Sequence, residues 1–121
     1  MVRPYRYVDV DRQGGISCVR LRQTSFSEAE LEELGAEIGR VVDEEGCRKL
    51  VLDLGPHDPE CLYSVFLAKL INLQKRLESD GGQLALCELS TATQGIFQAA
   101  GLDKFFYFYP NRAAACQALK K

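Results

Sequence analysis

The feature that most constrains this chain is the alternation of short apolar runs, typical of strands, with longer segments of helical periodicity. Residues 50–54 form a short, mostly apolar run, as expected of a strand that is buried on both faces. Two further strand-like runs follow at residues 83–88 and 105–109, and a helical segment precedes each of them. Strands that alternate with helices predict an α/β domain with a parallel or mixed sheet and right-handed crossovers.

The N-terminal part adds an antiparallel element to this pattern. Residues 5–11 and 16–21 each mix aromatic, β-branched and charged side chains, and Gly14 and Gly15 lie between them. Adjacent glycines adopt positive φ values at low cost, so this segment predicts a β-hairpin. The complete order is then β-β-α-β-α-β-α-β-α. The sequence contains no linker or repeat, so we expect one domain over residues 1–121.

The predicted helices have recognisable starts and apolar stripes. Ser27 and Glu30 form a capping box before the first helix. Its apolar stripe follows at three-, four- and seven-residue spacing: Leu31, Leu34, Ile38, Val41 and Val42. Its acidic residues are expected on the solvent face: Glu28, Glu32, Glu33, Glu37 and Glu44. A second helix is expected over residues 62–79, Ser90 is expected to cap a third, and Asn111 to open the last.

Composition excludes several classes of function. The net charge of −2 gives no broad basic surface for nucleic acid. No apolar run has the length of a membrane span, and no secretory signal is present. The five cysteines are widely spaced and odd in number, so we expect reduced thiols and a cytoplasmic location. Neither of the two common glycine-rich nucleotide-binding motifs occurs, and no cofactor is expected.

One loop contains the residue types of a small metal site or of a Cys–His pair. His57, the only histidine, is followed by Asp58, Glu60 and Cys61. The paired Cys/His spacing of a structural zinc site is absent, and there is no second histidine to act as a base. A solvated loop and a non-enzymatic protein are therefore favoured. A metal-binding or catalytic protein that uses His57 and Cys61 stays an alternative.

Ser64 lies at the predicted start of the second helix, beyond the carboxyl end of the strand at residues 50–54. In open α/β sheets, ligands and functional loops tend to lie at this end of the strands. A phosphate on Ser64 would meet unpaired backbone N–H groups and the positive end of the helix dipole. A serine is equally suited to a first-turn or N-cap position, and local chemistry alone favours that interpretation.

Several segments together resemble the STAS domain of anti-sigma-factor antagonists, over residues 5–119. The segments that carry the resemblance are residues 50–54, 67–70 and 81–86, Ile96-Phe97, the Gly-Leu-Asp-Lys-Phe sequence at 101–105, and the alanine-rich last helix. The resemblance implies a single STAS-like domain over residues 1–121. Such a domain has a mixed four- to five-stranded sheet, an N-terminal β-hairpin and about four helices.

In that family the loop between strand and helix carries Asp-Ser-Ser-Gly or a related sequence, and its first serine is the phosphorylation site. Ser64 falls on this position, while the flanking motif residues are replaced by Tyr63, Val65 and Phe66. The resemblance implies a non-enzymatic module that binds an anti-sigma factor or a serine kinase and releases it on phosphorylation. The three replacements favour an alternative, a constitutive scaffold or assembly module of the same fold without a phosphoswitch.

The resemblance also implies where a partner would bind. The surface consists of the loop before the second helix, the start of that helix and a nearby serine. Its candidate residues are His57, Asp58, Glu60, Tyr63, Ser64, Lys69 and Ser90. Neither nucleic acid nor a membrane is expected as a partner. The sequence does not indicate an oligomeric state.

Overall fold

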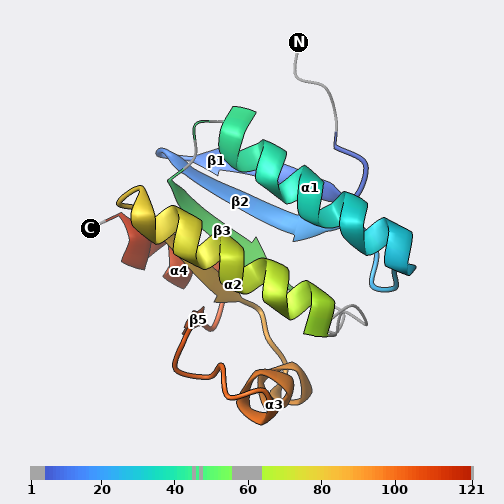
Figure 1. Cartoon of the computed structure of the whole chain (residues 1–121). Coiled ribbons are helices and arrows are strands. Elements are labelled where there is room, and N and C mark those ends of the chain that lie inside the picture. Colours follow the sequence, from blue (N-terminus) through green and yellow to red (C-terminus); the bar gives the residue numbers. More distant parts are fainter. Residues whose placement is uncertain (1–4, 45, 47, 56–63, 121) are drawn as a thin grey trace.

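The computed structural model describes residues 5–44, 46, 48–55 and 64–120 (Figure 1). Within these residues the chain forms a five-stranded sheet and four helices in the predicted order. The elements are β1 (Val8–Gln13), β2 (Ile16–Leu21), α1 (Glu28–Glu44), β3 (Lys49–Asp53), α2 (Ser64–Ser79), β4 (Gln83–Cys87), α3 (Thr91–Ala99), β5 (Tyr107–Tyr109) and α4 (Arg112–Leu119).

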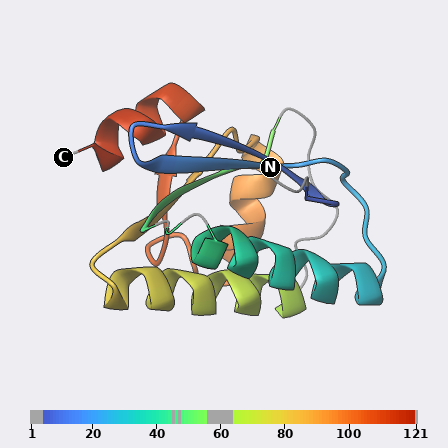
Figure 2. The same ribbon diagram turned by 90° about the horizontal axis from the view of Figure 1, so that it is seen from above.

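The sheet has the order β1-β2-β3-β4-β5, so neighbouring strands in the sheet are also consecutive in the sequence. β1 and β2 form the antiparallel hairpin, whereas β2, β3, β4 and β5 run parallel to one another. Figures 1 and 2 show α1 and α2 side by side on one face of the sheet and α4 on the opposite face. This mixed sheet with an N-terminal hairpin confirms the predicted α/β class.

Two apolar cores fill the spaces between the layers. The larger core lies between the sheet and the α1–α2 pair, and it contains the whole predicted stripe of α1. The smaller core lies between the sheet and α4, and its buried members are Ile16, Cys18, Val51, Ala85, Cys87, Ala115, Cys116 and Leu119. Successive strand residues point to opposite faces, so β2, β3 and β4 contribute to both cores. Burial on both faces explains why β3 and β4 are mostly apolar.

The predicted helix starts are confirmed by their hydrogen bonds. In the capping box, the Glu30 backbone N–H donates to Ser27 Oγ at 3.1 Å, and the Ser27 N–H donates to Glu30 Oε1 at 2.8 Å. At the start of α3, Ser90 Oγ accepts from the Thr93 N–H at 3.1 Å. Asn111 Oδ1 accepts from the Ala114 N–H at 2.8 Å before α4. Each cap satisfies a donor that has no partner inside its helix.

The expectation that all acidic residues of α1 face solvent is wrong for Glu37. Its side chain is buried, and its carboxylate accepts three backbone N–H groups from the two residues before β1 and from the first residue of β1. The donors are Arg6 at 2.8 Å, Tyr7 at 2.6 Å and Val8 at 3.1 Å. Glu37 therefore anchors the N-terminal segment against α1. A buried carboxylate is stable in this position because it is hydrogen-bonded.

The predicted strand at residues 105–109 is shorter than expected. β5 contains only Tyr107–Tyr109, because residues 105 and 106 belong to the turn that follows α3. The Phe105 N–H donates to the Leu102 carbonyl at 3.1 Å, which closes this turn. Phe106 packs edge-on against Phe97 of α3, with ring centroids 5.6 Å apart. The aromatic run thus divides between a turn and an edge strand, and Tyr107 is exposed on that strand.

Candidate functional site

The candidate site lies where β3 and β4 end side by side, and we call this region the carboxyl edge. It comprises Asp53 at the end of β3, residues 54 and 55 that follow it, residues 88–90 after β4, and the starts of α2 and α3 (Figure 1). The Leu54 N–H donates to the Cys87 carbonyl at 3.1 Å, so the two chains stay paired as they leave the sheet. The loops after β3 and β4 therefore begin at the same edge of the sheet, which is the edge where the sequence predicts functional loops.

The two chains are packed closely at the carboxyl edge. A Cβ atom on Gly55 would lie 2.7 Å from Glu88 Cβ and 3.1 Å from the Glu88 carbonyl oxygen. Glu88 itself has a φ of 62°, a left-handed conformation that costs free energy for a residue with a side chain. Backbone strain of this kind is found most often at functional positions.

A buried carboxylate supports the start of the loop after β3. Asp53 is fully buried, and its Oδ2 accepts from Arg20 Nη2 at 2.8 Å and from Arg20 Nε at 3.2 Å. Its Oδ1 accepts from the Gly55 N–H at 3.0 Å. Arg112 of α4 places Nη2 3.6 Å from Asp53 Oδ2, and it also pairs with Asp11 of β1. One carboxylate therefore connects β2, β3 and α4 to Gly55, two residues beyond the end of β3.

The sequence interpretation did not single out Asp53. The available signal was a charged residue inside an apolar run that is expected to be buried on both faces. A buried charge needs an opposite charge or several hydrogen bonds, so this position required a partner. The hydrogen bond to Asp53 raises the pKa of Arg20 above its ordinary value, and Arg20 therefore stays charged near neutral pH.

The structure describes only part of the predicted partner surface. His57, Asp58, Glu60 and Tyr63 lie outside the described residues, as does Cys61. Ser64 is the first residue of α2, so its backbone lies at the amino end of that helix, as predicted. Ser90 is half-buried, and its hydroxyl donates to Thr93 Oγ1 at 3.2 Å besides capping α3. The hydroxyl of Ser90 is therefore engaged within the protein.

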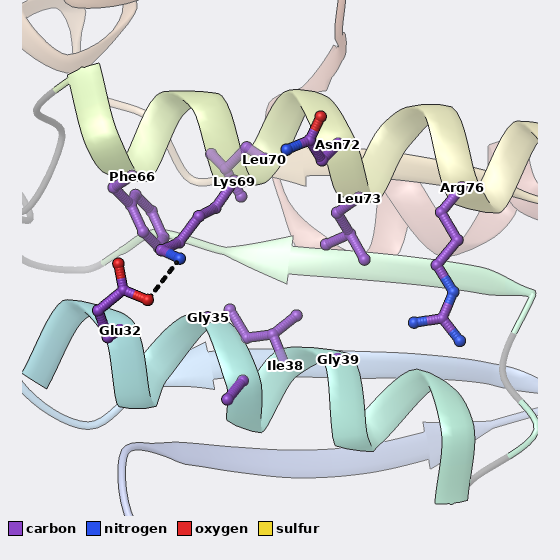
Figure 3. Close-up of a pocket in the computed structure, with 11 residues that line it drawn as sticks. Glu32, Gly35, Ile38, Gly39, Phe66, Lys69, Leu70, Asn72, Leu73 and Arg76 are labelled. Atoms are coloured by element: carbon purple, nitrogen blue, oxygen red, sulfur yellow. Dashed lines mark hydrogen bonds and ion pairs between the residues drawn. The ribbon is translucent and has the colours of Figure 1, made fainter.

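Lys69 lies on a groove between α1 and α2 that begins near the start of α2 (Figure 3). The groove has a volume of about 370 Å³, and its apolar floor includes Ile38, Phe66, Leu70 and Leu73. Lys69 Nζ pairs with Glu32 Oε2 at 3.2 Å across the groove. A Cβ atom on Gly35 would lie 2.6 Å from Lys69 Cδ, so the glycine provides the space in which Lys69 crosses. A second ion pair joins Arg76 to Asp43.

The described residues also bear on the metal-site alternative. Among them, no group of three or more His, Cys, Asp or Glu side chains could hold a metal ion. The proposed pair of His57 and Cys61 lies outside these residues and stays a prediction. None of the described helices combines the length and apolar character that a bilayer span requires.

Comparison with known proteins identifies the family. The STAS domain family matches residues 7–115, and the chain therefore belongs to this family. The candidate anti-sigma factor antagonist BtrV of Bordetella bronchiseptica is 34% identical over 105 residues, which cover 87% of this chain and 85% of BtrV. Proteins of this antagonist family are generally non-enzymatic.

Two solved structures have the same fold. An anti-sigma factor antagonist from Mycobacterium paratuberculosis is 26% identical, with a TM-score of 0.77 and complete coverage of both chains. The Bacillus cell fate determinant SpoIIAA, solved in its phosphorylated form, is 14% identical with a TM-score of 0.66, covering 92% of this chain and 98% of SpoIIAA. Together with BtrV, the antagonist relatives support a regulatory, partner-binding role.

Proposed function

We propose that this chain is a non-enzymatic module that binds an anti-sigma factor or a serine-kinase-like protein through the carboxyl edge. The observation that carries this proposal is the position of Ser64, which begins α2 directly after the loop that leaves β3. The resemblance to the antagonists implies that this position corresponds to their phosphoacceptor. The 34% identity to BtrV over most of both chains supports the same kind of function.

The geometry of the carboxyl edge suits a binding surface. The Asp53–Arg20 pair and the Leu54–Cys87 hydrogen bond hold the start of the β3–α2 loop in one position. Residues 54 and 55 are held in place before binding, so they lose less conformational entropy when a partner docks. The groove between α1 and α2 continues this surface along α2 as far as Arg76. Lys69 is a half-buried cation at the groove. It lies in the second turn of α2, close in sequence to the proposed phosphoacceptor Ser64.

Phosphorylation of Ser64 is the regulatory step that we propose. A phosphate carries a charge of about −1.5 to −2 near neutral pH. At the amino end of α2 it would be stabilised within this protein by backbone N–H groups and by the helix dipole. At the interface with a partner, the same charge would need to be desolvated and would repel acidic groups. The desolvation cost and the repulsion both lower the affinity of the complex, so phosphorylation releases the partner.

A constitutive scaffold of the same fold is the second candidate. Where the antagonist motif has a glycine, this chain has Phe66, and its side chain is completely buried in the larger core. Tyr63 and Val65 replace the two other flanking residues of the motif. A kinase that recognises the usual motif would meet a different surface here. In this case the chain binds its partner without a phosphoswitch.

One experiment separates the two candidates. The purified chain is incubated with ATP and a candidate serine-kinase-like anti-sigma factor, and the intact mass and phosphorylation site are then measured. A phosphate on the native chain that is lost in Ser64→Ala supports the switch. No phosphate, under conditions in which the kinase modifies a control substrate, supports the scaffold.

A binding assay completes the test. We expect Ser64→Glu to recover less partner than the native chain in a pull-down. Ser79→Glu is the matched control, because it adds the same charge at the exposed far end of α2. Equal recovery with Ser64→Glu and native chain contradicts control by charge. Failure of the native chain to bind either an anti-sigma factor or a kinase contradicts the proposed function itself.

A further inference from the structure

Two thiols meet on the face of the sheet that is opposite α1 and α2. Cys18 of β2 and Cys116 of α4 have their Sγ atoms 3.5 Å apart, although they are separated by 98 positions in the sequence. Both side chains are buried in the smaller core. In the described part of the chain, this is the one contact between two thiols. Neither cysteine belongs to the carboxyl edge, so their contact has no part in the proposed function.

We propose that Cys18 and Cys116 form an oxidation site that reacts with a peroxide and closes to an intramolecular disulfide. The bond would attach α4 covalently to β2 of the sheet. A disulfide has an S–S distance of about 2.05 Å, so the two sulfurs must approach by about 1.5 Å. Rotation of the two side chains and a small shift of α4 toward β2 provide this movement.

The reaction balances with one equivalent of hydrogen peroxide. The thiolate of one cysteine attacks a peroxide oxygen, the O–O bond breaks, and hydroxide leaves behind a sulfenic acid. The thiolate of the second cysteine attacks the sulfenic sulfur, the S–S bond forms, and the S–O bond breaks with loss of a second hydroxide. The two protons released by the thiols neutralise the two hydroxides. Two thiols are oxidised, one peroxide is reduced, and two water molecules result.

Opening of α4 controls access to this site. In the closed protein, burial and the adjacent Cys116 raise the pKa of Cys18 to about 12, so little reactive thiolate is present. α4 is a helix of only eight residues, which is too short to be stable without its tertiary contacts. An element with few buried contacts opens at lower free energy than the sheet on which it packs. Opening exposes Cys116, uncovers Cys18, and returns the pKa of Cys18 toward its ordinary value.

Cys87 provides an internal comparison. It lies on β4 in the same small core, it is fully buried, and burial also raises its pKa to about 12. It therefore shares the surroundings of Cys18 without the contact to a second thiol. If burial alone decided reactivity, Cys87 and Cys18 would behave alike. If the contact between two thiols decides reactivity, only Cys18 and Cys116 become linked.

The test uses the full chain with Cys47→Ser and Cys61→Ser, which leaves the three described cysteines. The protein is treated with hydrogen peroxide, the remaining thiols are alkylated, and the intact mass and linked peptides are measured. We expect loss of two hydrogens and a Cys18–Cys116 peptide, reversed by a thiol reductant. Adding Cys87→Ser leaves this result unchanged, whereas adding Cys116→Ser abolishes it. Cys116→Ala replaces the serine variant if that variant does not fold.

Two outcomes of this experiment overturn the proposal. They are the absence of a disulfide in the native pair, and equal disulfide formation when Cys116 is replaced.

The route through α4 opening has its own test, because Asn111→Ala removes the cap of α4 and should accelerate oxidation about fivefold. An unchanged rate contradicts that route. The oxidised chain should also melt about 5 °C or more above the reduced chain, and a lower melting temperature contradicts the attachment of α4.

Discussion

Replacement of Arg20 by methionine tests whether the buried carboxylate of Asp53 depends on its ion pair. Asp53 is 0% exposed, and Arg20 donates two charged hydrogen bonds to it, at 2.8 and 3.2 Å. Removing one partner of a buried pair typically costs about 3–5 kcal/mol, since the remaining charge stays desolvated. Arg112 Nη2 remains 3.6 Å from the same oxygen and offsets part of this loss. We therefore expect Arg20→Met to lower the free energy of unfolding by about 3 kcal/mol.

Arg22→Met is a closely matched control for this variant. The Arg22 side chain is 44% exposed, as is that of Arg20, and each arginine pairs with an aspartate at 2.8 Å. The two pairs differ in the acid, because Asp9 is 62% exposed and Asp53 is 0% exposed. An exposed pair of this kind contributes about 0–1 kcal/mol. The difference between the two variants therefore measures the effect of burying the carboxylate.

Urea unfolding followed by circular dichroism measures both variants. With an m value of about 1.5 kcal/mol/M, the midpoint for Arg20→Met should fall by about 2 M, and that for Arg22→Met by less than about 0.7 M. Asp53→Asn in the Arg20→Met background removes the unpaired charge and keeps an oxygen for the Gly55 N–H. This double variant should regain about 1–2 kcal/mol. Similar midpoints for the two arginine variants, at unchanged m value, would refute the reasoning.

Three further changes test other parts of the structure. Glu37→Ala should lower the free energy of unfolding by about 3 kcal/mol in the same assay, because buried backbone N–H groups lose their acceptor. Glu28→Ala, at an exposed position of the same helix, should cost less than about 1 kcal/mol, and equal losses would contradict the role of Glu37. Gly82→Ala should reduce the melting temperature sharply, since its Cβ would lie 1.8 Å from the Arg48 carbonyl oxygen; an unchanged melting curve would contradict this close approach. Elemental analysis should find no metal bound to the purified chain, and His57→Ala should leave its melting temperature unchanged; stoichiometric metal would revive the metal-site alternative.

The parts of the fold that depend on neighbours in the sequence were predictable. The capping box of Ser27 and Glu30 spans three residues, as does the cap of α3 by Ser90. The apolar stripe of α1 repeats within a few turns of the helix. Such patterns depend on local geometry, so they can be recognised before any tertiary contact is known.

The supporting contacts of the site were not predictable in the same way. Asp53 and Arg20 are 33 positions apart, and Glu37 meets Tyr7 across 30 positions. Helical periodicity assigned Glu37 to the polar side of α1, because the periodicity contains no information about the segment that precedes β1. The predicted length of the aromatic strand failed for a similar reason, since Phe106 turns toward Phe97 of α3. In each case a contact with another element decided the outcome.

The sequence alone determined the order of strands and helices, the hairpin, the helix caps, the position of Ser64 near the start of α2, and the resemblance to the STAS family. These properties follow from residue types and spacings within short segments. Only the tertiary structure decided which acidic side chains are buried, that Lys69 crosses a groove to Glu32, and that Cys18 meets Cys116. The physical reason is that burial and charge pairing depend on which surfaces the packed layers bring together, and those surfaces come from distant parts of the chain.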